Sequence, residues 1–265
     1  MENKIVGIAL GGGGSRGFAH IGVLKALEEE GIKPDIISGT SAGAIVGCLV
    51  ADGKFPEEIM TIMGEIELTD VAKIGLPKKG FASLDNLRKK LKRNLKANKF
   101  SELEKPLYVG LSNLLTGEIN YISTGDLTKA VQGSASIPII FSPVEINEQV
   151  YVDGGLLDNV PVKPLIDQCD IIIAVDIMPV EQVEVIEDVR DVITRVFQMT
   201  TSMQHYSRDS CDLIIEIEAV SKYSILDTRH NEEIYKLGYD HVKNLDLSQI
   251  KWITKISLLN FKEIL

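Results

Sequence analysis

DIISGTSAGAIVG, at residues 35–47, is a short apolar run that ends in Gly-Thr-Ser-Ala-Gly and continues as small and aliphatic residues. The pattern predicts a buried strand that passes directly into a helix, with Ser41 on the turn between them. Gly39 and Gly43, two positions before and two after the serine, lack the Cβ atoms that would block so sharp a bend. This is the sequence form of a nucleophile elbow, and it makes Ser41 the candidate nucleophile.

A strand and a glycine-rich turn precede this stretch. Residues 4–10, KIVGIAL, form a continuous apolar run typical of a strand buried on both faces. Residues 11–17, GGGGSRG, then open a helix whose apolar residues recur at helical spacing up to Gly31. With the strand at 35–38 they predict a βαβ unit, in which both strands are parallel and end at the same edge of the sheet. We therefore expect the glycine turn to lie beside Ser41.

The glycine turn has two interpretations. The N–H groups of Gly12, Gly13 and Gly14, at a helix N-terminus and free of side-chain cover, can stabilise an oxyanion, with the Ala42 amide as a further donor. Positions 12, 14 and 17 also satisfy G-x-G-x-x-G, the fingerprint of a dinucleotide site. A dinucleotide site needs an acidic residue at the end of the second strand, where this chain has Thr40. The sequence therefore favours the oxyanion hole.

An activated serine also needs a base, and the sequence offers two kinds. Three histidines lie downstream, where a Ser-His-Asp triad would use one: His205, His230 and His241. None of them sits in a motif. Asp153, which follows a predicted strand and precedes Gly154 and Gly155, is the better candidate, although Asp-Gly is also a common hairpin turn. A carboxylate is a weaker base than imidazole, so its pKa would have to be raised by burial.

Composition excludes several classes of protein. The 265 residues are 45% hydrophobic and 25% charged, which is ordinary for a globular protein. The net charge of −10 argues against a nucleic-acid partner. Cys48, Cys169 and Cys211 are odd in number and widely spaced, which predicts buried thiols and a cytoplasmic location. The four scattered histidines have no zinc spacing, and neither a metal nor a cofactor is expected.

The remaining chain alternates strands and helices. We predict further strands at residues 107–115, 118–123, 139–146, 149–152, 170–176 and 212–218. We predict helices over most of residues 56–106 and at residues 126–133, 161–168, 186–206 and 231–245. This alternation predicts an α/β fold, a three-layer α/β/α sandwich with a mostly parallel central sheet. The chain is expected to be one domain over residues 1–265, with a helical insertion at about 56–105 and an extension at 177–265.

Two segments suggest a membrane contact. Residues 78–99 carry nine basic residues and one acidic residue, Asp85, and Leu84, Leu87, Leu91 and Leu95 recur on one helical face. Such a basic amphipathic helix is either a surface helix with a solvated polar face or an element drawn to anionic head groups. Residues 251–265 contain the only tryptophan, Trp252, among aliphatic residues, and either pack on the domain or anchor it at an interface.

Three motifs in order resemble those of the patatin-like phospholipases. They are the glycine loop at residues 12–17, Gly-Thr-Ser-Ala-Gly at 39–43 and Asp-Gly-Gly at 153–155. Ser-Ala-Ser-Ile-Pro at 134–138 is also similar to the stretch that precedes the Asp motif in bacterial members. The resemblance covers about residues 5–176 and weakens beyond about 180. The related acyltransferases of fatty-acid synthesis have a histidine just before the nucleophile, where this chain has Thr40. This difference argues against a transferase activity.

The resemblance implies a Ser-Asp dyad without histidine. Ser41 would be the nucleophile, Asp153 the base, and Gly12, Gly13 and Gly14 the oxyanion loop. It assigns supporting positions to Arg16, Gly17, Gly39, Gly43, Gly154 and Gly155, with a structural role for Arg16. The implied activity is a serine esterase that releases fatty acid from phospholipid, lysophospholipid or related acyl esters. A non-catalytic lipid-binding or acyl-binding protein on the same fold is the alternative.

Overall fold

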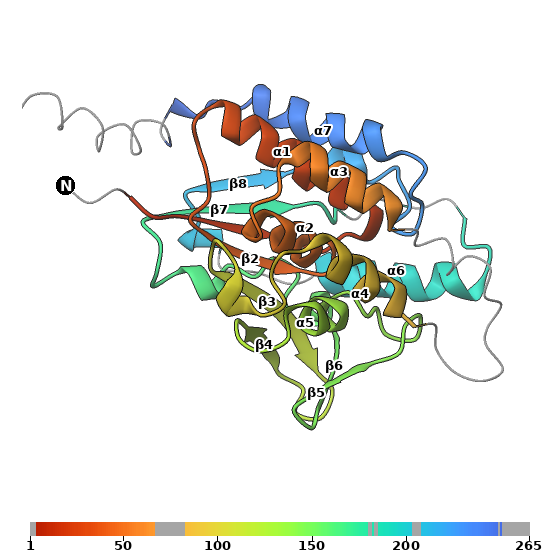
Figure 1. Cartoon of the computed structure of the whole chain (residues 1–265). Helices are drawn as coiled ribbons and strands as arrows, with labels where there is room; N and C mark the ends of the chain where they lie inside the picture. Colours follow the sequence, from red (N-terminus) through yellow and green to blue (C-terminus); the bar gives the residue numbers. More distant parts are fainter. Residues whose placement is uncertain are drawn as a thin grey trace, which may run out of the picture.

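A mixed β-sheet forms the centre of the molecule. The structure is a computed structural model, and it describes residues 4–66, 83–179, 182, 185–202, 208–248 and 250. The sheet has eight strands in the order β5-β6-β3-β2-β1-β7-β8, with β4 paired to β3 (Figure 1). The strands are β1 (Val6–Leu10), β2 (Ile36–Thr40), β3 (Leu107–Asn113), β4 (Ile119–Ile122), β5 (Val144–Ile146), β6 (Gln149–Asp153), β7 (Ile171–Asp176) and β8 (Leu213–Glu216).

Most of this sheet is parallel, as the sequence predicts. The neighbours β3, β2, β1, β7 and β8 run parallel, whereas β4, β5 and β6 pair antiparallel. The inner strands β1 and β2 are buried along their whole length, which explains the continuous apolar sequence of β1 and the small or apolar residues of β2. The predicted α/β fold with a mostly parallel central sheet is confirmed.

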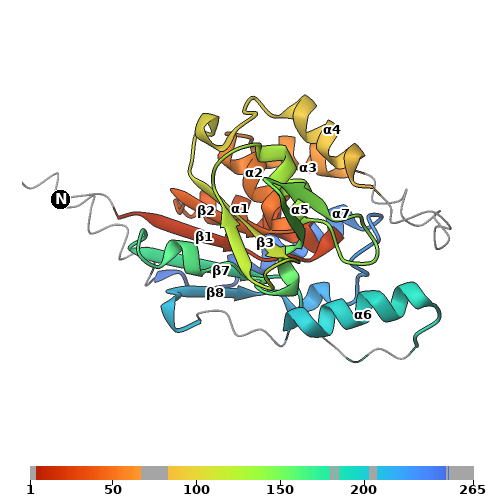
Figure 2. The same ribbon diagram turned by 90° about the horizontal axis from the view of Figure 1, so that it is seen from below.

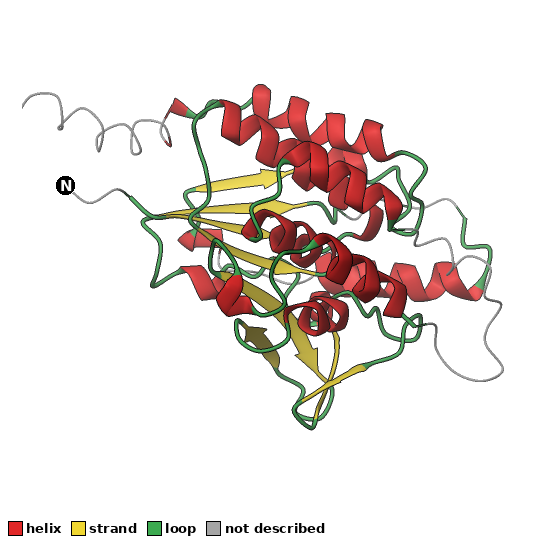
Figure 3. Ribbon diagram, viewed as in Figure 1, coloured by secondary structure: helices red, strands yellow, loops and turns green. Residues whose placement is uncertain are grey.

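Helices cover both faces of the sheet unequally. They are α1 (Phe18–Glu29), α2 (Ala42–Ala51), α3 (Pro56–Glu65), α4 (Asp85–Asn94), α5 (Leu127–Ser134), α6 (Val189–Ser202) and α7 (Asn231–Lys243). Figure 2 shows α2, α3 and α4 on one side of the sheet and α6 on the other, and Figure 3 shows how the helices gather on the first side. The larger hydrophobic core lies under these helices. A smaller core on the second face is closed by Val160, Val162 and Leu165 of an irregular segment.

Two predicted elements are much shorter in the structure. The strand predicted at 139–146 begins only at Val144, because Pro138 and Pro143 interrupt the segment before it and Ile139 adopts a positive φ of 72°. The helix predicted at 161–168 is a single 3-10 turn at Lys163–Leu165. Prolines at 161 and 164 cannot donate the amide hydrogen bonds that a longer helix needs. The helix predicted at 186–206 is described over Val189–Ser202.

The two segments that suggest a membrane contact are only partly described. The helix α4 confirms the amphipathic pattern, because Leu84, Leu87 and Leu91 are buried. Residues 78–82 and the closing segment at 251–265 lie outside the described residues. Over the part of the chain that the structure describes, none of the helices combines the length and the apolar character needed to cross a bilayer.

Candidate active site

Two strand ends meet at the centre of the sheet. Thr40, the last residue of β2, pairs with Gly110 of β3, and Asp153, the last residue of β6, pairs with the next residue, Leu111. Since β2 runs parallel and β6 antiparallel to β3, their C-terminal ends approach each other at this point. The register therefore brings Ser41, which follows β2, next to Asp153.

Ser41 sits on a strained turn between β2 and α2. Its backbone has φ 53° and ψ −120°, a conformation that residues with a Cβ atom rarely adopt. An added Cβ at Gly43 would collide with the carbonyl oxygen of Leu10, because α2 passes close to the end of β1. The four further glycines with supporting positions in the motifs are buried: Gly17, Gly39, Gly154 and Gly155. The nucleophile elbow predicted from the sequence has the backbone geometry that the motif requires.

Ser41 and Asp153 are hydrogen-bonded to each other. The Ser41 hydroxyl donates to Oδ2 of Asp153 over 2.7 Å, and the amide of Gly155 donates to Oδ1 over 2.8 Å. Ser41 is 6% exposed and Asp153 is fully buried. Burial raises the pKa of Asp153 to about 7, against the lowering effect of the bonds from Ser41 and Gly155. A carboxylate with this pKa can accept a proton near neutral pH.

A second serine supports the elbow from α5. The hydroxyl of Ser134 accepts a hydrogen bond from the Ser41 amide over 2.9 Å and donates to the carbonyl of Gly110 over 2.6 Å. It thereby links the elbow to β3 on a buried path. The residue lies in the motif at 134–138, but no spacing rule distinguishes this serine from Ser136, so sequence reasoning missed its position.

The glycine loop lies against the elbow, as expected, but the amides of Gly12, Gly13 and Gly14 differ in their hydrogen bonds. A Cβ built on Gly12 would lie 3.1 Å from the Cβ of Ser41. The Gly12 amide donates to the carbonyl of Asn159 over 3.2 Å. Among the described residues, no acceptor is assigned to the amides of Gly13 and Gly14, and Gly14 has a positive φ of 57°. The last two amides are thus the ones available to a ligand.

A buried histidine fixes the start of this loop. Nε2 of His20, on α1, donates to the carbonyl of Gly11 over 2.7 Å. His20 is fully buried, and desolvation lowers its pKa to about 4, so the ring is neutral at physiological pH. The sequence analysis did not single out His20. Its position three residues after Gly17, on the helix that the loop opens, is the signal that could have found it.

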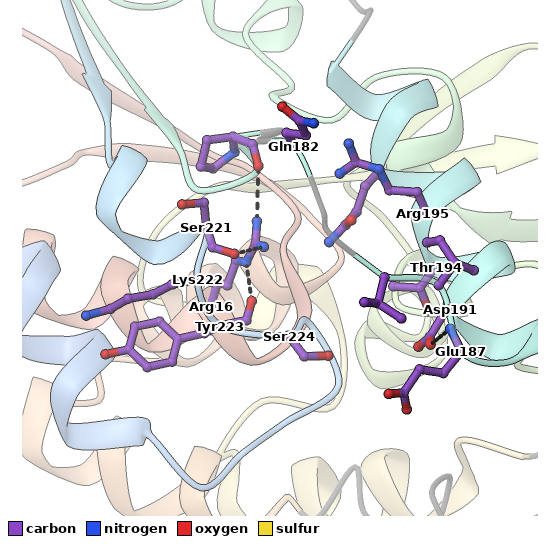
Figure 4. A pocket seen from close by; sticks show the side chains of 14 residues that line it. Arg16, Gln182, Glu187, Asp191, Thr194, Arg195, Ser221, Lys222, Tyr223 and Ser224 are labelled. Carbon is purple, nitrogen blue, oxygen red and sulfur yellow. Dashed lines mark hydrogen bonds between the residues drawn. The ribbon is translucent and has the colours of Figure 1, made fainter.

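Arg16 holds the loop to the C-terminal part of the chain. Its guanidinium donates to the carbonyls of Tyr223 and Ser221 over 2.9 Å each and to that of Pro179 over 3.3 Å. Figure 4 shows these bonds at the wall of a cavity of about 440 Å³ between the loop and α6. The side chain is 3% exposed. It therefore crosslinks the glycine loop to three backbone carbonyls of the later chain.

An apolar pocket opens on Ser41. Its walls come from α1, α2, α3, α4 and the segments after α5 and β8, and they include Phe18, Ile45, Met63, Leu87, Ile137 and Ile225. Ser41 and Ser15 are among the few polar residues that line it. A wall of this kind suits an aliphatic chain and offers little to a polar ligand.

Neither His230 nor His241 is hydrogen-bonded to Ser41 in the part of the chain that the structure describes. His230 precedes α7 and its Nδ1 lies 3.3 Å from Glu233. His241 lies near the C-terminal end of α7, and burial lowers its pKa. His205 is outside the described residues. The hydroxyl of Ser41 has Asp153 as its partner instead.

Comparison with known proteins identifies relatives that match about two thirds of this chain. The chain is 28% identical over 194 residues to lysophospholipase NTE1 of Kluyveromyces lactis. The matched stretch covers 68% of this chain and 13% of that protein. It is 31% identical over 178 residues to an uncharacterized NTE family protein of Mycobacterium bovis. That match covers 65% of this chain and 49% of the other protein. The chain thus spans less than half the length of these relatives.

The fold and a family model agree with these matches. The crystal structure of VipD from Legionella pneumophila superposes with a TM-score of 0.54 at 16% identity, over 91% of this chain and 66% of that chain, and so shares the fold. The model of the patatin-like phospholipases matches residues 8–166, which contain all three motifs. Because this match covers more than half of the chain, the protein belongs to the patatin-like phospholipase family.

Proposed function

We propose that the protein is a serine lipid acyl hydrolase in which Ser41 and Asp153 form a catalytic dyad. The observation that carries this proposal is the 2.7 Å hydrogen bond from the Ser41 hydroxyl to a fully buried carboxylate whose pKa is about 7. The base is already oriented, and its raised pKa brings it close to the value that suits proton transfer at neutral pH.

The reaction would proceed through an acyl-enzyme. Oγ of Ser41 attacks the ester carbonyl carbon as its proton passes to Oδ2 of Asp153. The tetrahedral intermediate collapses, the carbon–oxygen bond to the alcohol breaks, and the alcohol leaves with the proton from Asp153. A water molecule then attacks the acyl carbon and gives a proton to Asp153. Collapse of the second intermediate releases the fatty acid and returns the proton to Ser41.

The oxyanion would be held by the glycine loop. The amides of Gly13 and Gly14 are the candidates with no acceptor assigned among the described residues, and the Ala42 amide lies at the N-terminus of α2. Gly12, whose amide bonds Asn159, would contribute by allowing close approach to Ser41. Donors at a helix N-terminus stabilise negative charge, and each is worth about 10²–10³-fold in kcat.

The substrate would be a phospholipid, a lysophospholipid or a related acyl ester. The apolar walls beside Ser41 support an aliphatic acyl chain. The name lysophospholipase carried by relatives supports the lipid class. Three free thiols, Cys48, Cys169 and Cys211, support action in a reducing compartment such as the cytoplasm.

Hydrolysis of a short-chain nitrophenyl ester tests the dyad. We expect Ser41→Ala to lose at least about a thousandfold in kcat/KM, and Asp153→Asn to lose roughly 10²–10⁴-fold. Variants that replace His205, His230 or His241 should keep the activity. Loss of activity in one of these histidine variants, with the fold intact by circular dichroism, would favour a triad and contradict the proposal.

A fluorophosphonate probe separates an enzyme from a binding protein. Labelling that maps to Ser41 and is lost in Ser41→Ala supports an activated serine. Absence of labelling in well-folded protein supports a non-catalytic lipid-binding or acyl-binding protein on the same fold. Hydrolysis of a lipid panel, followed by mass spectrometry, then identifies the head group and chain length.

A further inference from the structure

The backbone hydrogen bonds of the glycine loop can be followed residue by residue. The Gly11 amide donates to a carbonyl of β7 over 3.0 Å, which extends the pairing of β1 with β7 by one residue. The Gly11 carbonyl accepts from Nε2 of His20 over 2.7 Å. At the other end of the turn, the Gly13 carbonyl accepts from the Arg16 amide over 3.1 Å. Gly12 lies between these two fixed points, so its partners decide how the loop is oriented.

Both backbone groups of Gly12 are bound by one residue, Asn159. The Gly12 amide donates to the main-chain carbonyl of Asn159 over 3.2 Å. The side-chain Nδ2 of Asn159 donates to the Gly12 carbonyl over 3.5 Å, which is longer than a typical N–H···O bond. Asn159 is 4% exposed, so water competes little for these contacts. The two bonds resemble strand pairing, with a carboxamide in the place of the second backbone amide.

The carboxamide of Asn159 also lies between two of the motifs. A Cβ built on Gly12 would lie 2.6 Å from Oδ1 of Asn159, and one built on Gly155 would lie 2.9 Å from the same atom. A side chain at either position would therefore displace the carboxamide. The Gly155 amide in turn donates to Asp153 over 2.8 Å. Asn159 thus packs against the glycine loop on one side and against the turn that holds Asp153 on the other.

The planar peptide group links the Gly12 carbonyl to the next amide. Across a trans peptide bond, the C=O of one residue and the N–H of the next point in opposite directions. All peptide bonds of the described residues are trans. Because the Gly12 carbonyl faces Asn159, the Gly13 N–H points away from Asn159. Gly13 and Gly14 are the loop residues whose amides have no acceptor assigned in the described part of the chain.

We propose that Asn159 is a positioning residue that orients the glycine loop for the reaction. By binding both backbone groups of Gly12, it aims the Gly13 amide at the negative oxygen that forms when Ser41 attacks an ester. Asn159 acts through the loop and does not touch the reacting atoms, and its role rests on the proposed function. An oxyanion donor is worth about 10²–10³-fold in kcat, and a displacement of about 1 Å can cost about 10²-fold.

Two substitutions separate the hydrogen bond of the carboxamide from its packing. Asn159→Ala removes the carboxamide, whereas Asn159→Asp keeps its shape and replaces the Nδ2 donor by an oxygen. With a short-chain nitrophenyl ester, each should lower kcat about 10- to 100-fold and change KM by less than about threefold, because the loop acts on the transition state. Rates are compared at about pH 8.5, above the pKa of Asp153 of about 7, so that the base is ionised in each variant.

A transition-state analogue distinguishes orientation from loss of folded protein. An alkyl trifluoromethyl ketone adds to the hydroxyl of Ser41 and forms a hemiketal whose negative oxygen occupies the place of the oxyanion. We expect its inhibition constant to rise about 10- to 100-fold in both Asn159 variants, in parallel with the fall in kcat/KM. A smaller fraction of folded enzyme would lower kcat and leave the inhibition constant unchanged. The measurement is therefore informative even for a partly unfolded variant.

Asn113 provides the matched control. It is also 4% exposed, and it lies at the end of β3, where it pairs with Tyr151 of β6. Its side chain bonds Gln149 over 3.0 Å and two amides of the turn after β3. Asn113→Ala and Asn113→Asp thus make the same buried changes near Asp153 but outside the glycine loop. Both should keep kcat and the inhibition constant within about threefold of the wild-type values.

Three results would overturn the inference. They are an unchanged kcat in both Asn159 variants, a lower kcat with an unchanged inhibition constant, and equal losses in the Asn113 variants. The second result would leave Asn159 with a purely structural role. Failure of the proposed function is distinct, because wild-type protein would then hydrolyse no ester, whereas failure of this inference leaves wild-type protein active.

Discussion

The backbone strain at Ser41 can be separated from the chemistry of its hydroxyl. With φ 53° and ψ −120°, the residue lies in a region that is open to glycine and costs other residues about 1–3 kcal/mol. The fold imposes this conformation, because β2 ends at Thr40 and α2 begins at Ala42. The same turn holds Oγ against Asp153. Strain and function therefore coincide at one residue.

Comparison of Ser41→Gly with Ser41→Ala measures the strain. Both variants lose the hydroxyl and its bond to Asp153, so their difference reflects the Cβ atom alone. We expect the glycine variant to have the larger free energy of unfolding, by about 1 kcal/mol, in urea titration. Equal stability, or a more stable alanine variant, would contradict the conformation described for the elbow.

The pH dependence of activity reports on Asp153. The base must be ionised, and its pKa is about 7, so kcat/KM should be low in acid, rise through about pH 7 and level off above it. Hydrolysis of a soluble ester measured from about pH 5.5 to about pH 8.5 gives this profile. A profile that is already flat at the acid end would mean that Asp153 titrates as an ordinary carboxyl group.

At the scale of elements, a buried carboxylate ties α2 to the segment after α4. Asp52 follows the last residue of α2 and is 2% exposed. Its oxygens accept hydrogen bonds from the amides of Lys96 and Ala97 over 2.9–3.1 Å. Through this contact the elbow helix fixes the chain just after α4, the helix whose Leu87 lines the pocket. The basic helix is thus anchored by the same element that carries Ser41.

Replacement of Asp52 tests this anchor. Asp52→Ala leaves two amides without their acceptor, and we expect the free energy of unfolding to fall by about 1–3 kcal/mol. Asp209→Ala, which removes an exposed carboxylate, should change it by less than about 0.5 kcal/mol. Thermal or urea unfolding of both variants makes the comparison. Equal effects would show that the Asp52 contact contributes nothing specific.

At the scale of the whole molecule, folding shifts the pKa values of two buried groups in opposite directions. The pKa of His20 falls from 6.5 to about 4 on folding, so the unfolded chain binds the extra proton between these values and stability falls as the pH is lowered. The pKa of Asp153 rises from 3.8 to about 7, so the folded chain binds the extra proton and stability falls as the pH is raised. The contributions of the two groups to the pH dependence of the free energy of unfolding therefore oppose each other between about pH 4 and 6.5.

Single substitutions at Asp153 and His20 should separate these two contributions to stability. Relative to wild type, Asp153→Asn should make the free energy of unfolding rise more steeply with pH between about 4 and 6.5, by up to about 1.4 kcal/mol per pH unit. His20→Gln should make it rise less steeply by a similar amount. Urea titrations at several pH values measure both slopes. Parallel curves for the three proteins would contradict the burial of these two groups.

The sequence by itself determined the elements whose causes are local. The apolar runs of β1, β2 and β7, the glycine turn and the elbow at Ser41 follow from side-chain size and backbone freedom within a few residues. Asp153 could be proposed as the base from its motif, and Arg16 as a supporting residue. The elements at 139–146 and 161–168 were overestimated, because prolines limit hydrogen bonding there.

Only the tertiary structure decided which distant groups meet. The strand register, in which Thr40 and Asp153 pair with adjacent residues of β3, joins Ser41 to Asp153 across more than a hundred positions. The support from Ser134, the bond from His20 to Gly11 and the pKa of Asp153 depend on burial that no local pattern encodes. Local propensity acts over a few residues, whereas desolvation and hydrogen bonding between strands arise only when the whole sheet is assembled.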